Sequence, residues 1–277
     1  MTYRELYEYG AEKLRSKEIA EHDLDARLLL EKICDIDRNT LLVHGNRAPS
    51  AEEEAAYLEA IQRRAEHIPL QHILGEQEFM GLTFAVNEHV LVPRQDTEIL
   101  VEEALRDLHD GMSILDLCTG SGCILLSLLH YSNDCLGVGT DISEKALEVA
   151  RGNSQRLNLK AEFLESDLYE KVVGKYDMIV SNPPYIPTSV IEGLMSEVKD
   201  HDPILALDGG EDGLCFYRNI IRKASDYLYG SGMLIVEIGH DQGAQVQALF
   251  EDNGFTNISV IKDYAGLDRV VKGYKHV

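Results

Sequence analysis

The sequence has no apolar run long enough to cross a membrane. A membrane-spanning helix needs roughly 20 consecutive apolar residues, and no stretch of the 277 residues provides them. Residues 1–6 also carry charges where a signal peptide would have its apolar core. Both absences predict a cytoplasmic protein that does not associate with membranes.

The sequence also lacks the cysteine spacing that builds disulfide frameworks or thiolate zinc sites. Its five cysteines are an odd number, and none of them belongs to a Cys-x-x-Cys pair. Free cysteines of this kind are usually small buried residues. We therefore expect no metal site, and the cysteine usage agrees with a cytoplasmic location.

Positive charge is scarce. The chain has 26 lysines and arginines against 48 aspartates and glutamates, which gives a net charge of −22. A charge of this sign opposes binding to a phosphate backbone, although a local basic patch could still exist. The composition therefore disfavours nucleic acid as a partner and favours small molecules or a protein with basic patches.

Residues 1–74 are expected to form a small helical domain. Thr2 with Glu5, and Ser50 with Glu53, have the spacing of a capping box, in which two side chains satisfy backbone groups at a helix start. Helices of this length are not stable alone in water. We therefore expect them to pack into a bundle.

Apolar residues recur at helical spacing in this domain, for example on a face through Leu24, Leu28 and Leu29. Pro69 is expected to stop the last helix, because proline removes a backbone donor. Residues 75–92 then change to short apolar stretches among glycines, a pattern that predicts a hairpin linker.

Residues 93–277 alternate short apolar strands with amphipathic helices, which predicts a parallel sheet covered on both faces. The last two strands follow each other without a helix, so we expect an antiparallel hairpin at the sheet edge. The prediction is an α/β fold with a seven-stranded, mostly parallel sheet after the helical bundle. The expected strands are 114–117, 136–141, a third that starts at 163–164, 176–181, 233–238, 258–261 and 268–272.

A glycine-containing turn follows the first of these strands. Open parallel sheets bind ligands at the carboxyl ends of their strands, and glycines there let the backbone approach a ligand. Asp141 ends the second strand, where a carboxylate can accept hydrogen bonds from both hydroxyls of a ribose. The turn consists of Cys118, Thr119, Gly120, Ser121 and Gly122.

The turn lacks the third glycine of the dinucleotide fingerprint. Leu125 stands at the position where Gly-x-Gly-x-x-Gly would place it, and a large side chain there disfavours the helix packing associated with pyrophosphate binding. The turn therefore suits a nucleoside ligand without a pyrophosphate, such as S-adenosyl-L-methionine. The position of Asp141 argues against a turn that binds nothing.

Asn182-Pro183-Pro184-Tyr185 ends the fourth strand, at the sheet edge where a methyl acceptor would meet this cofactor. The Asn182 side-chain oxygen and the Pro183 carbonyl can each accept one N–H of an NH2 group, which aims the nitrogen lone pair at the methyl donor. The two prolines restrict the backbone, and Tyr185 offers a flat face to a planar amide or base. All four are candidate substrate-binding residues, and Asn182, Pro183 and Tyr185 are candidate catalytic residues. Alone, the segment could be a strand end broken by prolines.

The chain resembles the release factor glutamine methyltransferases of the PrmC/HemK type over nearly its whole length. Besides residues 182–185, the resemblance rests on residues 92–98, 203–213 and 265–269. Enzymes that methylate amino groups of DNA and RNA share the Asn-Pro-Pro-Tyr segment, whereas the other segments are narrower. Cys118 and Gln95 stand where the family often has glycine and proline.

The resemblance implies a Rossmann-like class I S-adenosylmethionine-dependent methyltransferase that methylates the glutamine N5 atom in the Gly-Gly-Gln loop of peptide chain release factors. S-adenosyl-L-homocysteine would be the product. It further implies that residues 118–122, Asp141 and Asn182 contact the cofactor and that residues 1–74 help to engage the release factor. It places Leu168 near the adenine, where some relatives have an aromatic residue.

Three questions are left open by the sequence. An amino-methyltransferase acting on adenine or cytosine in DNA or RNA would share the same tetrapeptide, although the net charge argues against it. A non-catalytic binding module is opposed by the intact Asn182 and Tyr185. Arg94, Asp96 and Glu98 either begin a helix, with acids near its positive end, or line the site directly.

Overall fold

The computed structural model describes residues 1–276, which fall into two compact units. The first unit contains Met1–Glu76 together with Met195–His201, and the second contains Gln77–Leu194 and the chain from Asp202 onward. None of the described helices is both long enough and apolar enough to cross a membrane.

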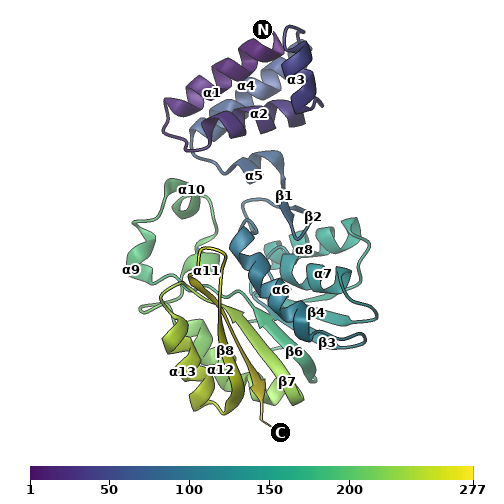
Figure 1. Ribbon diagram of the computed structural model, residues 1–277, viewed down its shortest axis with the longest axis vertical. Helices are drawn as coiled ribbons and strands as arrows, with labels where there is room; N and C mark the ends of the chain where they lie inside the picture. The colour runs from purple at the N-terminus through teal and green to yellow at the C-terminus, as the bar shows by residue number, and fades with distance from the viewer. Residues whose placement is uncertain (277) are drawn as a thin grey trace. The chain divides into compact units, whose positions relative to one another are not determined.

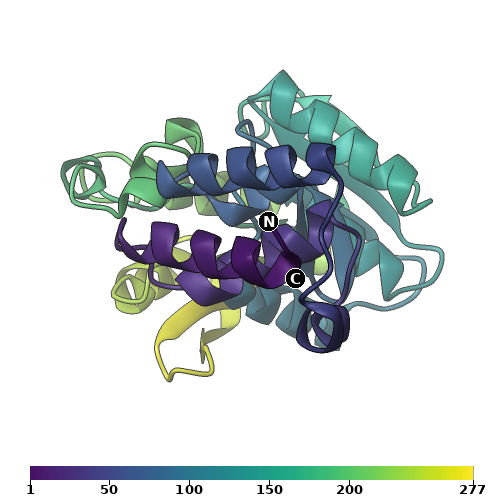
Figure 2. The ribbon, with the colours of Figure 1, turned by 90° about the horizontal axis from the view of Figure 1, so that it is seen from above.

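The first unit is a bundle of helices (Figure 1). Both expected capping boxes are present, at Thr2 with Glu5 and at Ser50 with Glu53. Figure 2 shows the first helix, in purple, running beside the fourth. The helices are α1 (Tyr3–Arg15), α2 (His22–Ile33), α3 (Arg38–His44), α4 (Ala51–Ala65), α5 (Leu70–Leu74) and the short α10 (Ser196–Lys199).

Two details of this unit differ from the sequence prediction. Helix α4 ends at Ala65, and Pro69 is the cap residue of α5, so the proline precedes a helix instead of stopping one. This placement is favourable because the first residues of a helix need no backbone donor. Leu24 is exposed, whereas Leu29 is fully buried, so the buried face of α2 does not include Leu24.

A cluster of ion pairs around the buried Arg64 joins Met195–His201 to the rest of the first unit. Arg64, only 4% exposed, donates from Nε to Asp25 at 2.6 Å and from Nη2 to Glu197 at 2.5 Å. Burial raises the pKa of Asp25, and the hydrogen bond from Arg64 opposes this shift. The segment Met195–His201 is thereby tied to α2 and α4.

The second unit is built on the predicted seven-stranded sheet, with strand order β5-β4-β3-β6-β7-β9-β8. Strands β3 to β7 are parallel, and β9 runs antiparallel to both β7 and β8. The strands are β3 (Ser113–Leu117), β4 (Leu136–Asp141), β5 (Glu162–Glu165), β6 (Tyr176–Ser181), β7 (Leu228–Glu237), β8 (Phe255–Lys262) and β9 (Asp268–Lys275); a separate hairpin consists of β1 (Glu76–Phe79) and β2 (Leu82–Ala85).

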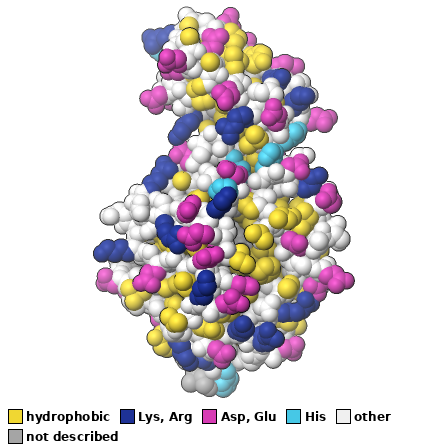
Figure 3. Space-filling model, turned by 180° about the vertical axis from the view of Figure 1, so that it is seen from behind, with side chains coloured by type: hydrophobic (Ala, Val, Ile, Leu, Met, Phe, Trp, Pro, Cys, Tyr) yellow, Lys and Arg dark blue, Asp and Glu magenta, His cyan; other side chains and the backbone are white. Residues whose placement is uncertain are grey.

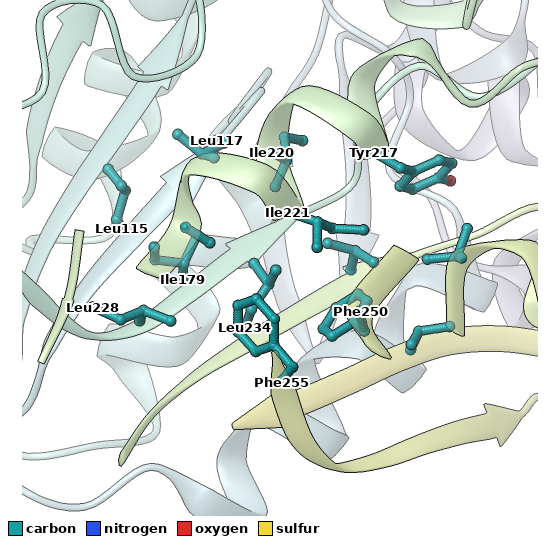
Figure 4. Packing of buried hydrophobic residues seen from close by; sticks show 14 of the residues in the cluster. Leu115, Leu117, Ile179, Tyr217, Ile220, Ile221, Leu228, Leu234, Phe250 and Phe255 are labelled. Atoms are coloured by element: carbon teal, nitrogen blue, oxygen red, sulfur yellow. The ribbon is translucent and has the colours of Figure 1, made fainter. Parts of the chain in front are cut away.

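Helices cover both faces of this sheet because successive strand residues point to opposite sides. In β6, Met178 and Val180 pack in the cluster with α6 (Glu98–Asp107) and α7 (Cys123–His130). Ile179, between them, packs in the cluster with α12 (Cys215–Tyr227) and α13 (Gly243–Asp252), which Figure 4 shows from close by. Helix α8 (Glu144–Arg156) packs on β4 and β5, and η1 (Gln95–Thr97), α9 (Thr188–Ile191) and α11 (Ile204–Leu207) are short.

Gly10 provides a test of the packing in the first unit. A Cβ atom added at Gly10 would overlap the hydroxyl of Tyr57, which donates to the Ala26 carbonyl at 3.2 Å. Gly10→Ala is expected to lower the free energy of unfolding by about 1–3 kcal/mol through overpacking, although alanine favours a helix over glycine by about 1 kcal/mol. Urea denaturation followed by circular dichroism measures the change.

Gly152 is the matched control, because it lies on the exposed face of α8 and no atom lies within 4 Å of an added Cβ. Gly152→Ala is expected to be neutral or stabilising relative to the unchanged chain. Equal effects of the two substitutions would contradict the packing of Tyr57 against Gly10.

Candidate functional site

A cavity of about 250 Å³ lies in the second unit, where β3, β4 and β6 end. Strand β3 lies between β4 and β6, so the chain leaves β3 toward one side of the sheet and returns on the other. Such a reversal is the usual ligand site of an open parallel sheet. The cavity is lined mainly by Thr97, Cys118, Thr119, Gly120, Ser121, Asp141, Ile142, Ser143, Ser166, Asp167, Leu168, Asn182, Pro184, Pro203, Leu205, Ala206 and Phe216.

The turn after β3 is held against the end of β4. Gly120 N–H donates to Asp141 Oδ2 and Ser143 N–H donates to Asp141 Oδ1, each at 2.9 Å. Burial raises the pKa of Asp141, and these backbone hydrogen bonds oppose the rise. The Ile142 backbone also hydrogen-bonds this carboxylate, so about one of its roughly four acceptor sites is left for a ligand.

The turn needs residues that tolerate positive φ. Gly120 has φ +55°, and Gly122 has φ +79°. Cys118 adopts φ +59° although it is not glycine. The turn is therefore left-handed at this position even with a cysteine where the family often has glycine. Four of the five predicted turn residues line the cavity, whereas Gly122 is the cap residue of α7 and lies outside the lining.

Asp116 lies beneath this turn and is fully buried. Its Oδ2 accepts a hydrogen bond from the Thr119 hydroxyl at 2.6 Å. Burial raises the pKa of Asp116 to about 7, and the bond from Thr119 opposes the rise. The acid therefore keeps a substantial protonated fraction near neutral pH.

The tetrapeptide 182–185 follows β6, which pairs with β3 on the side opposite to β4. Ser181 Oγ donates to the Leu117 carbonyl at 2.7 Å and joins the ends of the two strands. Asn182 and Pro184 line the cavity, whereas Pro183 and Tyr185 are not part of its lining. Pro183 is buried, and Tyr185 is half-buried.

The side-chain amide of Asn182 has a defined partner. Its Nδ2 donates to Thr97 Oγ1 at 3.3 Å, so its Oδ1 is the atom left to accept a hydrogen bond from a ligand. The Tyr185 hydroxyl donates to Glu237 Oε1 at 3.3 Å, and burial raises the pKa of this tyrosine.

The segment 203–213 closes over the tetrapeptide. Gly209 N–H donates to the Ile186 carbonyl at 2.8 Å, and a Cβ added at Gly209 would lie 2.7 Å from Tyr185 Cα. Glycine is therefore required for this close approach. Pro203, Leu205 and Ala206 from the same segment line the cavity.

Residues 92–98 lie next to the cavity. Thr97 lines it, whereas Arg94, Asp96 and Glu98 do not. Arg94 donates to Asp202 at 2.6 Å, and the Asp96 carboxylate lies 3.1 Å from Arg269 Nη2. Glu98 accepts the Met80 N–H at 2.6 Å. The segments 92–98 and 265–269 thus meet through the ion pair of Asp96 with Arg269.

Sequence reasoning missed Glu237, which ends β7 and is 2% exposed. Burial raises the pKa of its carboxyl to about 7, opposed by Thr97 and by the charge of Arg269. An acid inside the apolar run Met233–Ile238 was the available signal. Ile142 and Phe216 were also missed, because apolar cavity residues cannot be told from core residues by pattern.

The described residues show no group of side chains that could hold a metal ion, and charges of both signs mix on one face. Residues 1–276 contain no group of three or more His, Cys, Asp or Glu side chains arranged to hold a metal ion. On the face shown in Figure 3, acidic and basic side chains are interspersed.

Known proteins match the chain over almost its full length. The model of the PrmC N-terminal domain matches residues 5–75, and that of the methyltransferase small domain matches residues 95–197. A release factor glutamine methyltransferase of Agrobacterium fabrum is 41% identical, over 94% of this chain and 92% of that protein. Proteins of the same name from Geobacter sulfurreducens (40%; 98% and 96%) and Clostridium botulinum (38%; 100% and 100%) also match. The chain belongs to the release factor glutamine methyltransferase family.

Solved structures support the methyltransferase fold of this family member. A methyltransferase from Pyrococcus furiosus has a TM-score of 0.56 at 18% identity and covers 82% of this chain and 100% of its own. A T. thermophilus 16S rRNA methyltransferase, solved with AdoMet and guanosine, has a TM-score of 0.53 at 18% identity, with coverage of 73% and 50%. At these identities the likeness concerns the fold.

The raised pKa of Asp116 predicts a loss of stability with rising pH. Burial raises the pKa of this carboxyl to about 7 in the folded protein, from its ordinary value of 3.8 when exposed, so the native state binds more protons between these values. The free energy of unfolding should therefore fall from about pH 4 to pH 7, by up to about 4 kcal/mol for this group.

Asp116→Asn removes this titration and should flatten the decline, while the contributions of Asp141 and Glu237 remain in both proteins. Urea denaturation at about pH 5 and about pH 8 measures the difference. The same decline in the variant and in the unchanged protein would show that Asp116 titrates normally.

Proposed function

We propose that the chain binds S-adenosyl-L-methionine in this cavity and methylates the N5 amide of the glutamine in the Gly-Gly-Gln loop of peptide chain release factors, which modulates translation termination. The observation that carries the proposal is that Asn182 lines the same cavity as Gly120 and Asp141. One part of the cavity suits a nucleoside and the adjacent part suits an amide. The names of the relatives support this substrate.

The residues of the cavity fit the cofactor. Asp141 lines the cavity and retains an acceptor site for a ribose hydroxyl, and the apolar side chains of Leu168 and Phe216 suit the adenine. When bound, S-adenosyl-L-methionine supplies a methyl group on a sulfonium, and S-adenosyl-L-homocysteine is the product. The cofactor-binding residues that we assign are Cys118, Thr119, Gly120, Ser121, Gly122, Asp141, Leu168 and Asn182, with Gly122 acting through the helix start.

Two oxygens of the tetrapeptide orient the amide. Asn182 Oδ1, free because Nδ2 donates to Thr97, and the Pro183 carbonyl each accept one N–H of the glutamine. With both hydrogens held, the nitrogen lone pair points along the remaining direction, toward the methyl donor. Asparagine performs this role without adding a full charge. Pro184 restricts the backbone, and Tyr185 provides the flat face beside the amide.

We assign residues 1–74 as the domain that engages the release factor, residues 75–92 as the linker and residues 93–277 as the catalytic domain. Leu42 and Val43, neighbours on α3, are 64% and 70% exposed and offer an apolar contact to a protein partner. The net charge of −22 favours a partner with basic patches over nucleic acid. A substrate in translation termination places the enzyme in the cytoplasm.

A labelling experiment tests this function. Purified protein is incubated with methyl-labelled S-adenosyl-L-methionine and an unmodified bacterial release factor, and peptides are analysed by mass spectrometry. One methyl group is expected on the glutamine of the Gly-Gly-Gln loop, and none when this glutamine is replaced by asparagine. The substrate assignment fails if the loop glutamine stays unlabelled, or if DNA or RNA is labelled instead.

The role of Asn182 gives a second prediction. Asn182→Ala removes one of the two acceptors and should lower kcat by about 100-fold or more, as loss of one preorganised hydrogen bond does in other active sites. The dissociation constant of the cofactor, measured by calorimetry, should change much less. Asn133→Ala, on an exposed loop at the opposite end of the strands, is the control and should keep full activity. Full activity of Asn182→Ala would refute the assigned role.

A further inference from the structure

Glu237 is a buried acid that the mechanism above does not use. It ends β7, whose residue Val236 pairs with Ser181 of β6, so Glu237 lies beside the tetrapeptide. The Tyr217 hydroxyl donates to its backbone carbonyl at 2.9 Å and holds this strand end in place. Because burial of an acid is costly, the position calls for an interaction that an apolar residue could not make.

The first interaction of Glu237 is with Tyr185. The Tyr185 hydroxyl donates to Glu237 Oε1 at 3.3 Å, and the Tyr185 backbone carbonyl accepts from Gln242 Nε2 at 3.1 Å. The ring is therefore held at its far end and at its backbone. An anchored ring presents its face in one orientation, which an unanchored tyrosine would not.

The second oxygen of Glu237, Oε2, is buried and has no hydrogen-bond partner among the described residues. Thr97 is the neighbouring hydroxyl that lowers the pKa of this carboxyl. Thr97 Oγ1 also accepts from Asn182 Nδ2 at 3.3 Å. Because Thr97 accepts from Asn182, its own hydroxyl proton is available to the unsatisfied Glu237 oxygen. A hydroxyl has one proton to donate, so a Thr97 that turns it toward Glu237 presents its lone pairs to Asn182. Only the NH2 end of the Asn182 amide can then turn toward Thr97, and Oδ1 is left for the substrate.

The surrounding charges keep Thr97 in this position. Thr97 belongs to the turn η1, and its neighbour Asp96 lies 3.1 Å from Arg269 Nη2, which is also 3.0 Å from Asp263. Arg269 in turn lowers the pKa of Glu237. The segments 92–98 and 265–269 thus converge on the same carboxyl from different elements.

We propose that Glu237 is a positioning residue that, through Thr97 and Tyr185, sets both the amide of Asn182 and the ring of Tyr185 for a carboxamide substrate. This inference rests on the proposed function. Glu237 does not touch the substrate, and its role is to select one of the two orientations of the Asn182 amide and one orientation of the ring.

The test compares Glu237→Leu, which removes the acceptor at similar size, with Glu237→Gln, which retains an acceptor oxygen. Glu237→Leu should lower kcat/KM for the release factor by about 10- to 100-fold, the effect of leaving buried partners unpaired. Glu237→Gln should restore kcat/KM to within about 5-fold of the unchanged enzyme. The cofactor dissociation constant and the midpoint of thermal unfolding are measured for each variant.

Thr97→Val and Tyr185→Phe separate the two branches, since each removes one hydroxyl. If they act through Glu237, combining either with Glu237→Leu should give less than the product of the separate losses. Should Glu237→Leu fail to fold, Thr97→Val and Tyr185→Phe decide the matter, and wild-type kcat/KM in both overturns the proposal. Glu103→Gln is the control, because Glu103 is a buried acid on α6 paired with Lys272, away from the cavity.

The outcomes distinguish this inference from the proposed function. If the unchanged enzyme does not label the loop glutamine, the proposed function fails. If it does, and Glu237→Leu keeps wild-type kcat/KM, only the positioning role is overturned. The positioning role is also overturned if a folded Glu237→Leu variant loses cofactor affinity in proportion to its loss of kcat/KM. It is likewise overturned if Glu103→Gln lowers kcat/KM as much as Glu237→Leu does.

Discussion

The site depends on the pairing of β3 with β6 at the point where the chain reverses its direction across the sheet. This pairing brings the turn after β3 and the tetrapeptide after β6 to one edge, although about 60 residues separate them. The hydrogen bond from Ser181 to the Leu117 carbonyl, 2.7 Å long, joins these ends directly. The turn that suits a nucleoside follows β3, and the tetrapeptide that suits a carboxamide follows β6. The two lie side by side because β3 and β6 pair.

The elements around this pair restrict the tetrapeptide from several sides. Segment 203–213 packs on the Tyr185 backbone through Gly209, and Gln242 holds the Tyr185 carbonyl. Thr97 holds the amide of Asn182. The segments 92–98, 203–213 and 265–269 therefore mainly support the acceptor site. Only part of the first two lines the cavity, and no residue of 265–269 does.

Sequence patterns were sufficient for the features that local spacing determines. Alternating strands and helices predicted the sheet and its edge hairpin, and the capping boxes at Thr2 and Ser50 are present. The contacts of Glu237 could not be predicted, because its partners Thr97 and Tyr185 come from distant segments. Pro69 was misjudged because a proline suits a helix start as well as a helix end, and local sequence does not decide between them.

The central claim is that the tetrapeptide holds the substrate amide by neutral oxygens beside the cofactor. Its most direct test is the distance from Asn182 Oδ1 to the glutamine amide nitrogen in a crystal structure with S-adenosyl-L-homocysteine and a release factor. The account predicts a hydrogen bond of about 2.7–3.2 Å, with the nitrogen facing the cofactor sulfur. A glutamine held by other residues, or a tetrapeptide turned away from the cofactor, would contradict it.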